Sequence, residues 1–280
     1  MPVINTNIAA NSAVRYLNLN AADQSSSLSK IASGSRINKA SDDAAGLAIS
    51  TRVKSDVVAL EQAATNASHS IAMLQTADGG AARISDILMR MKALASQAAS
   101  ATVQGSSAAP NEMRAYIDAE FQKLDDEINA IATATRYNGQ ALLDGTGTFG
   151  NVLVGSSATD VISITLVADA QLSSASLGIA ALDVSTQAGA TTALTALATA
   201  LDRVSDTRAD IGSAQSRFEF RAETIATSIE NLSAANSAIE DVDIAAEQAK
   251  LAAAEVKVQA AVAAAASANS MPQALLKLLG

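Results

Sequence analysis

Apolar residues recur along most of this 280-residue chain at alternating steps of three and four positions. That spacing places them on one face of an α-helix, and its repeat of seven residues is typical of coiled coils. The longest such stretches cover residues 43–100 and 191–239, and shorter ones cover 11–32, 113–134 and 251–269. We therefore predict a mainly α fold of long antiparallel coiled-coil helices.

The middle of the chain has a different pattern. Glycine becomes frequent there, and Asn138–Gly139 and Asp144–Gly145 are dipeptides that favour tight turns. Two short runs rich in β-branched residues, 152–154 and 161–167, are separated by a polar segment and predict a β-hairpin. We expect the β structure of the chain to be confined to a small region at about 136–185.

The sequence SGSRINKASDDAAGLAI, residues 33–49, interrupts the first two helical patterns. Gly34 can adopt the left-handed conformation that ends many helices. Ser41 is positioned to cap the next helix, and Asp42 and Asp43 would place negative charge on its first turn. We expect one helix to end and a longer one to begin within this stretch.

The two chain ends carry opposite charge. Residues 1–40 contain four basic residues and one acidic residue, whereas residues 236–280 contain three basic and five acidic residues. Each end is a short helix that is too weakly apolar to be stable alone, so it should order only against a partner. We therefore predict that the N- and C-termini pair with each other.

Composition and charge narrow the functional classes. The net charge of −9 and the pI of about 4.6 argue against nucleic acid as a partner. The chain has no cysteine and one histidine, His69, which we expect at the surface or in a helix seam. No histidine cluster is therefore available for a metal site or a catalytic triad. The acidic groups 42–43 and 125–127 are adjacent in sequence and do not converge like paired catalytic carboxylates. We expect no enzyme activity and no cofactor.

Two further patterns concern membranes and export. No uninterrupted run of about 18 apolar residues occurs, so we predict no transmembrane helix and no membrane insertion. The N-terminal sequence MPVINTNIAANSAV lacks the basic segment and the long apolar core of a cleavable signal peptide. Export from the cytoplasm would therefore need another route.

Several motifs in this chain resemble those of bacterial flagellins. They are VINTN at 3–7, SGSRINKASDDAAGLAI at 33–49, RYNGQALLDG at 136–145, RADIGSAQSRFE at 208–219, NLSAANSAIEDVDIAAE at 231–247 and MPQALLKLL at 271–279. The resemblance covers about 1–145 and 190–280, in the order and spacing of that family.

The resemblance implies an architecture in two parts. Residues 1–42 and 240–280 would form the two halves of the inner-core domain of a hollow filament. Residues 43–239 would form a rod domain, with the turn and hairpin region at about 136–185. The short span between the matching halves implies a short form without large outer domains.

The resemblance also implies a function. The chain would be a structural subunit that polymerises into the bacterial flagellar filament for swimming motility. It would be exported unfolded through the flagellar type III system and reside outside the cell. Its partners would be copies of itself, an export chaperone, the filament cap and the hook-junction proteins. Two alternatives stay open: a hook–filament junction protein of the same superfamily, and an amphipathic helical module that binds membranes or a partner bundle.

Two groups of residues are candidate contact sites. The first group would join subunits through charge at the 33–49 stretch and through an apolar patch at the C-terminus: Arg36, Lys39, Asp42, Asp43, Leu275, Leu276, Leu278 and Leu279. The second group matches the positions through which some flagellins are recognised by an innate immune receptor: Arg90, Leu94 and Glu120.

Overall fold

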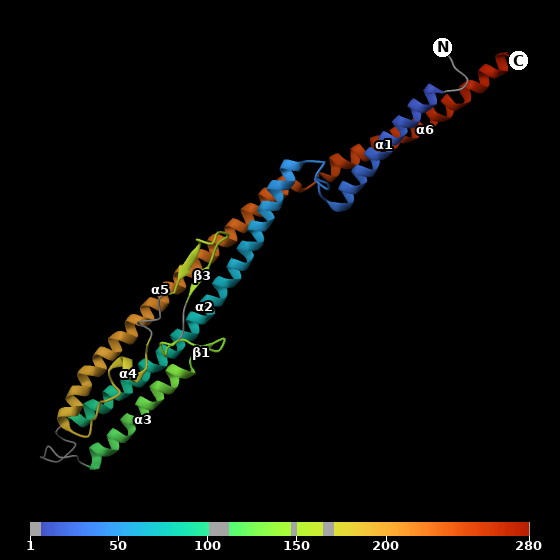
Figure 1. The fold of residues 1–280 in the computed structure, drawn as a ribbon. Coiled ribbons are helices and arrows are strands. Elements are labelled where there is room, and N and C mark those ends of the chain that lie inside the picture. The colour runs from blue at the N-terminus through green and yellow to red at the C-terminus, as the bar shows by residue number, and fades with distance from the viewer. Residues whose placement is uncertain (1–6, 101–111, 147–149, 165–170, 280) are drawn as a thin grey trace. The chain divides into compact units, whose positions relative to one another are not determined.

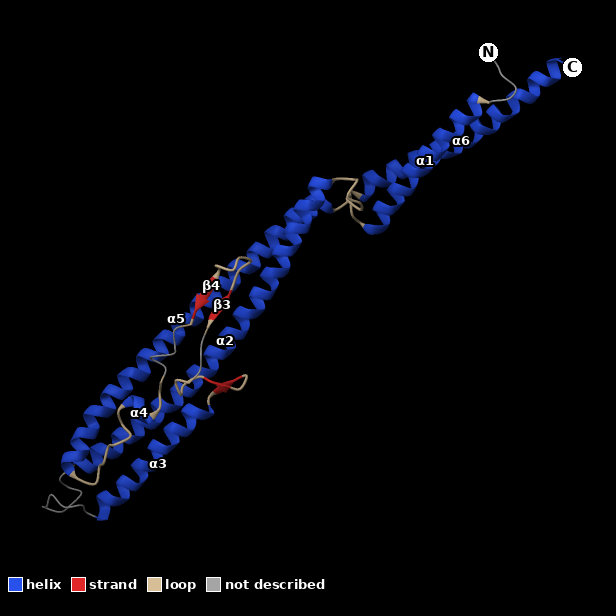
Figure 2. Cartoon of the chain, viewed as in Figure 1, coloured by secondary structure: helices blue, strands red, loops and turns tan. Residues whose placement is uncertain are grey.

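The computed structural model describes residues 7–100, 112–146, 150–164 and 171–279, and from 271 onward it describes the backbone only. In these ranges the chain forms six helices and four short strands (Figures 1 and 2). The helices are α1 (Ile8–Ser33), α2 (Ala44–Ala99), α3 (Glu112–Ala134), α4 (Ser174–Leu177), α5 (Gln187–Glu240) and α6 (Ile244–Leu279). The strands are β1 (Arg136–Tyr137), β2 (Gln140–Ala141), β3 (Asn151–Leu153) and β4 (Val161–Ser163).

The prediction of a mainly α fold with paired termini is confirmed. The helix predicted over 43–100 corresponds to α2, and the one predicted over 113–134 corresponds to α3. The first and last long helices, α1 and α6, lie side by side (Figure 1). The chain divides into two compact units, which we call the terminal unit (residues 1–57 and 230–280) and the central unit (residues 58–229). The domain limits expected from the resemblance concern a filament and stay a prediction.

The terminal unit has a thin apolar seam between α1 and α6. Ala254, Ala261 and Ala268 are buried on α6 at intervals of seven residues. At the start of α1, the Asn7 side chain accepts a hydrogen bond from Ala10 N at 3.0 Å and donates to Ala268 O at 2.8 Å. Because alanine contributes little apolar area, this pair of helices buries less per turn than a seam of leucines would.

The central unit has a denser core. Along α5 the buried side chains recur every seven residues: Leu197, Val204, Ile211, Phe218 and Ile225. Along α2 two such rows are buried, and their largest fully buried members are Leu74, Ile84, Leu88 and Met91. The third helix, α3, adds Ile117, Phe121 and Ile128. The repeat of seven residues that predicted the coiled coil is therefore the repeat of the core.

Two small hairpins follow α3. Strands β1 and β2 pair antiparallel around Asn138 and Gly139, whose φ angles of 49° and 80° are those of a two-residue hairpin turn. The sequence predicted this turn but not the strands beside it. Strands β3 and β4 form the predicted hairpin, shifted by one residue at 151–153 and shorter at 161–163. Residues 165–167 of the predicted second strand lie outside the described residues.

The prediction that no helix spans a membrane stays a prediction. By length and composition alone, the Ile244–Ser270 part of α6, 27 residues long, is apolar enough to cross a membrane. The two criteria differ because the sequence prediction required an unbroken apolar run, whereas alanine raises the average hydropathy of a window even where charged residues interrupt the run. This property is shared by helices that pack inside proteins, and this segment packs against α1.

Candidate functional site

Two chain segments that are about 200 residues apart meet in the terminal unit, and we call them the junction (residues 34–43 and 240–243). The backbone joins them: Arg36 N donates to Glu240 O at 2.6 Å, and Val242 N donates to Gly34 O at 3.0 Å. Ser35 and Asp241 form an antiparallel bridge between these two bonds. Gly34 has φ 71° and ends α1 in the left-handed conformation, as predicted. The junction therefore holds the ends of α1 and α5 together.

The acidic half of the junction differs from the prediction. Ser41 does not cap α2. Asp43, which directly precedes the helix, accepts a hydrogen bond from Gly46 N at 2.8 Å and is the capping residue. Asp42 does not lie in the first turn either. Its carboxylate accepts hydrogen bonds from the backbone of Asn38 and Lys39, and these bonds hold the pKa of Asp42 below its usual range.

The basic half of the junction is exposed. The Arg36 guanidinium donates to Ile239 O at 2.5 Å, which leaves its other nitrogens open to solvent. The Lys39 side chain is exposed as well and makes no ion pair among the described residues. Between them, Ile37 is buried and anchors the loop. The four junction charges predicted from the sequence thus lie in one loop, but no ion pair joins any two of them in the described part of the chain.

Glu240 ties together the helices that meet at the junction. Its carboxylate accepts from Lys54 Nζ at 2.6 Å, from Ser50 Oγ at 2.7 Å and from Asn236 Nδ2 at 3.3 Å. These bonds, with that from Lys54 strongest, lower the pKa of Glu240. The sequence counted Glu240 as one of the five acidic residues in 236–280 and did not reveal this role. The signal that could have found it is Asn236, a polar residue of the helix seam four positions before Glu240.

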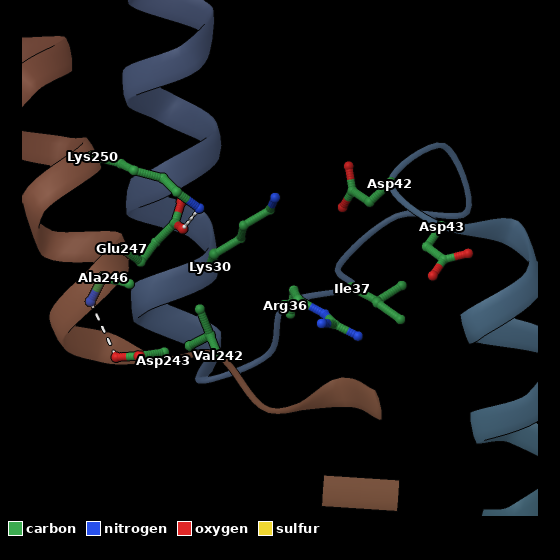
Figure 3. A pocket seen from close by; sticks show the side chains of 10 residues that line it. All are labelled: Lys30, Arg36, Ile37, Asp42, Asp43, Val242, Asp243, Ala246, Glu247 and Lys250. Carbon is green, nitrogen blue, oxygen red and sulfur yellow. Dashed lines mark hydrogen bonds and ion pairs between the residues drawn. The ribbon is translucent and has the colours of Figure 1, made fainter. Parts of the chain in front are cut away.

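An open hollow of about 360 Å³ lies beside the junction (Figure 3). On its α1–α6 side, Glu247 is 5% exposed and accepts from Ser27 Oγ and Lys250 Nζ, each at 2.8 Å. The Lys250 and Ser27 bonds lower the pKa of Glu247. Figure 3 shows Lys30 reaching into the hollow from α1, with Asp42 on the opposite wall. The hollow thus presents both signs of charge to any chain that approaches it.

The terminal unit also exposes large apolar side chains. More than a third of each is accessible to solvent, and they lie on α1 and α6 away from the seam: Ile8, Val14, Tyr16, Leu19, Leu28, Ile244, Val256 and Val262. Single exposed apolar residues are common, but so many on one pair of helices favour a surface that is covered in an assembly. The predicted contact residues Leu275, Leu276, Leu278 and Leu279 continue α6, and their side chains lie outside the described residues.

The residues matched to receptor recognition lie in the central unit. Arg90 on α2 and Glu120 on α3 form an exposed ion pair at 2.7 Å. Leu94 is 3% exposed and belongs to the core. The structure therefore brings the two charged members together at the surface and places the leucine beneath it. Receptor contact by this group stays a prediction.

The described part of the chain offers few side chains that could form a catalytic or metal site. No group of three His, Asp or Glu side chains there could hold a metal ion. His69 is exposed, as predicted, and its Nδ1 lies 3.2 Å from the hydroxyl of Tyr137.

Long antiparallel helices, with both chain ends in one thinly packed and partly uncovered unit, define a helical structural protein of the kind that assembles through its termini. Comparison with known families agrees with this class. Residues 4–148 match the bacterial flagellin N-terminal helical region, and residues 194–279 match the bacterial flagellin C-terminal helical region. The chain belongs to the bacterial flagellin family, in a short form without a large outer domain, and is a flagellar filament subunit.

Similar proteins cover nearly the whole chain. It is 37% identical over 278 residues to a flagellin of Halalkalibacterium halodurans and 34% identical over 305 residues to a flagellin of Bacillus subtilis. It is 32% identical over 291 residues to the flagellar filament 30.7 kDa core protein of Treponema maltophilum. Each alignment covers 99% of both chains. The crystal structure of Bacillus cereus flagellin matches 57% of this chain and 88% of that chain, with a TM-score of 0.50 and 29% identity.

Proposed function

We propose that this chain polymerises with copies of itself through its paired ends to form the filament that drives swimming. The observation that carries the proposal is the uncovered apolar surface of α1 and α6, on a unit whose own seam is mostly alanine. Burying one exposed valine or leucine against a neighbour stabilises a contact by roughly 1.5–3 kcal/mol. Contacts of a head-to-tail kind that do not close on themselves produce filaments.

The junction charges supply the specificity of this assembly. The side chains of Arg36, Lys39 and Asp42 are exposed and form no ion pair among the described residues. They are therefore available to a neighbouring subunit. Charges at the rim of an interface mainly set register and exclude wrong partners. The leucines at 275, 276, 278 and 279 add an apolar contact at the end of α6.

We extend the proposal to the specific partners and to the location of the chain, on the support of its family membership. The chain leaves the cell unfolded through the flagellar type III system, with an export chaperone on its C-terminal segment. The cap protein guides its insertion, and hook-junction proteins hold the base of the filament. Support comes from the full-length similarity to proteins named flagellin or flagellar filament core protein, which favours a filament subunit over a hook–filament junction protein.

Assembly of the full chain tests the proposal. We expect the purified protein to form filaments after seeding, as seen by electron microscopy and sedimentation. Leu19→Asp places a charge on the exposed apolar face of α1 and should abolish or sharply reduce filament mass. Asn18→Asp adds the same charge one residue away, at an exposed polar position, and should assemble normally. Equal assembly of both variants would refute a role for this face.

Truncation and lipid binding separate the alternatives. Removal of residues 1–40 or 240–280 should leave a folded helical protein that does not polymerise, and polymerisation of either truncation would contradict the proposal. A membrane-binding module would instead carry the full-length monomer to the top of a flotation gradient with liposomes. A filament subunit should stay at the bottom.

A further inference from the structure

Residues 172–184 cross the surface of α3 as an irregular segment that includes α4, and we call this segment the strap (Figure 1). It is anchored by four buried apolar side chains: Leu172, Leu177, Ile179 and Val184. Its first residue also donates from its backbone to Leu143 O at 2.9 Å. The strap is therefore a packed part of the central unit, although most of it is not helical.

A row of polar side chains on α3 binds the strap along its length. Val184 N donates to Asp118 Oδ1 at 3.0 Å, and Gln122 Nε2 donates to Leu182 O at 2.9 Å. Nearer α4, Asn129 both accepts from the backbone of Ser174 at 3.0 Å and donates to its hydroxyl at 2.8 Å. These α3 residues are spaced by four and seven positions, so they share one face of the helix.

Asp125 lies in the middle of this row and differs from its neighbours. It is 8% exposed, and its Oδ1 atom is buried without a hydrogen-bond donor among the described residues. The hydroxyl of Ser174 is its contact on the strap. A carboxylate that is buried with one oxygen unsatisfied is costly when charged and much less so when protonated.

The charged groups around Asp125 do not compensate its charge. The charged group that acts on Asp125 is Asp126, the next residue of α3, and it carries the same sign of charge. Two arginines of α2 and α5 are engaged elsewhere: Arg90 pairs with Glu120, and Arg203 donates to the Ser176 carbonyl. Burial, with a smaller contribution from the charge of Asp126, raises the pKa of Asp125, and the Ser174 bond opposes this rise.

We propose that Asp125 is a proton-operated latch for the strap: its neutral carboxyl keeps residues 172–184 bound to α3, and loss of the proton loosens them. The direction follows from linkage, because the closed strap favours the protonated form and protonation must therefore favour the closed strap. The closed strap is most stable below the pKa of an exposed aspartate, which is about 3.9. It weakens as pH rises and stays weak above the raised pKa of the closed state. The latch lies in the central unit and does not depend on polymerisation.

Hydrogen exchange in the full-length monomer tests the latch. The readout is the protection factor, the ratio of intrinsic to observed exchange rate, because exchange itself depends on pH. We expect protection of the Ser174 and Ile179 amides to fall as pH rises through the titration of Asp125. The fall is about tenfold for each pH unit that separates the closed-state and open-state pKa values. The amide of Leu88 in α2 is the internal reference and should not follow this transition.

Two variants separate Asp125 from its surroundings. Asp125→Asn cannot ionise and should keep the acid level of strap protection at every pH. Asp126→Asn, at the exposed neighbouring position, should keep the transition and move it to slightly lower pH. Titration of Asp183 cannot produce the same transition. Hydrogen bonds from Ser185 and Asp118 lower the pKa of Asp183, and its protonation would loosen the far end of the strap in acid, which is the opposite direction.

The outcomes that overturn the latch are distinct. Strap protection that is independent of pH in the unmodified chain would refute it, as would an unchanged transition in Asp125→Asn. If that variant fails to fold, the carboxyl ¹³C shift of Asp125 in the unmodified protein still decides. Its titration midpoint must coincide with the protection transition, and a separate midpoint would overturn the proposal.

Discussion

Glu247 offers the sharpest test of how the two ends of the chain are joined, and we predict that Glu247→Ala destabilises the α1–α6 pair by about 2–4 kcal/mol. The carboxylate is buried and accepts from the Ser27 hydroxyl of the opposite helix at 2.8 Å. A hydrogen bond to a charged group contributes roughly 1.5–3 kcal/mol. The bond from Lys250 adds about 0.2–1 kcal/mol, because that side chain is 68% exposed and its charge is screened by solvent.

The same contact predicts a pH dependence. The pKa of Glu247 is lowered in the folded state, chiefly by Lys250 and then by Ser27. A carboxyl with a depressed pKa adds stability above its unfolded pKa, about 4.3, and that stability is lost as pH falls through the folded pKa. The terminal unit should therefore open more readily in acid, and Glu247→Ala should remove this contribution to the acid sensitivity.

A double-mutant cycle isolates the bond between the two helices. The assay is native-state hydrogen exchange of the α1 amides, because a chain with two units need not unfold in one step. At pH 7 we expect a coupling energy of about 1.5–3 kcal/mol between Ser27→Ala and Glu247→Ala. Glu255→Ala, at an exposed position of α6, is the control and should change stability by less than about 0.5 kcal/mol. A coupling energy near zero would refute the account of the buried bond.

Three further predictions concern the junction and the core. Reversing Asp42 and Asp43 to Lys should leave the helical signal of the central unit unchanged in circular dichroism but impair or alter filaments in electron microscopy; normal filaments would reduce the pair to local caps. Phe218→Ala empties a fully buried core position and should cost about 3–5 kcal/mol in denaturant unfolding of the central unit, where a loss below 1 kcal/mol would contradict tight packing. Gly79→Ala adds a methyl group to open space within α2 and should stabilise the central unit by roughly 0.5–1 kcal/mol. Gly80→Ala, one residue on, would bring its methyl group to 2.5 Å from the side chain of Thr135 and should destabilise by about 1–3 kcal/mol. Equal effects of the two alanines on the melting temperature would contradict that contrast.

Helix periodicity predicted much of the fold because it is the pattern of the core itself. The row from Leu197 to Ile225 is buried at every seventh residue, and its members were visible in the sequence as a seam. Leu94 lay outside the predicted seam and is nevertheless buried. At this level α2 has neighbours on two sides: Arg90 pairs with Glu120 of α3, and Gln187 of α5 donates to Ala99 O. A heptad pattern that assumes one partner helix cannot predict which residues of α2 are buried by a second one.

The candidate site was less predictable because it depends on contacts between the two ends of the chain. Ser41, Asp42 and Asp43 are all good capping residues, and local sequence cannot choose among them. The choice follows from the docking of residues 34–36 onto residues 240–242, which sets where the loop must turn. Glu247 was counted as one acidic residue among several, because its partner Ser27 lies 220 positions away.

Because of that separation, the terminal unit can fold only in a chain that carries both α1 and α6. Closing a loop of this length carries a conformational entropy that α1 alone cannot offset, so α1 has no stable partner until α6 exists. A chain interrupted between residues 230 and 239 contains the whole central unit but cannot bury Ser27 against Glu247 or complete the junction. The helix α6 therefore decides whether α1 folds, although Ser27 and Glu247, which join the two helices, are 220 positions apart.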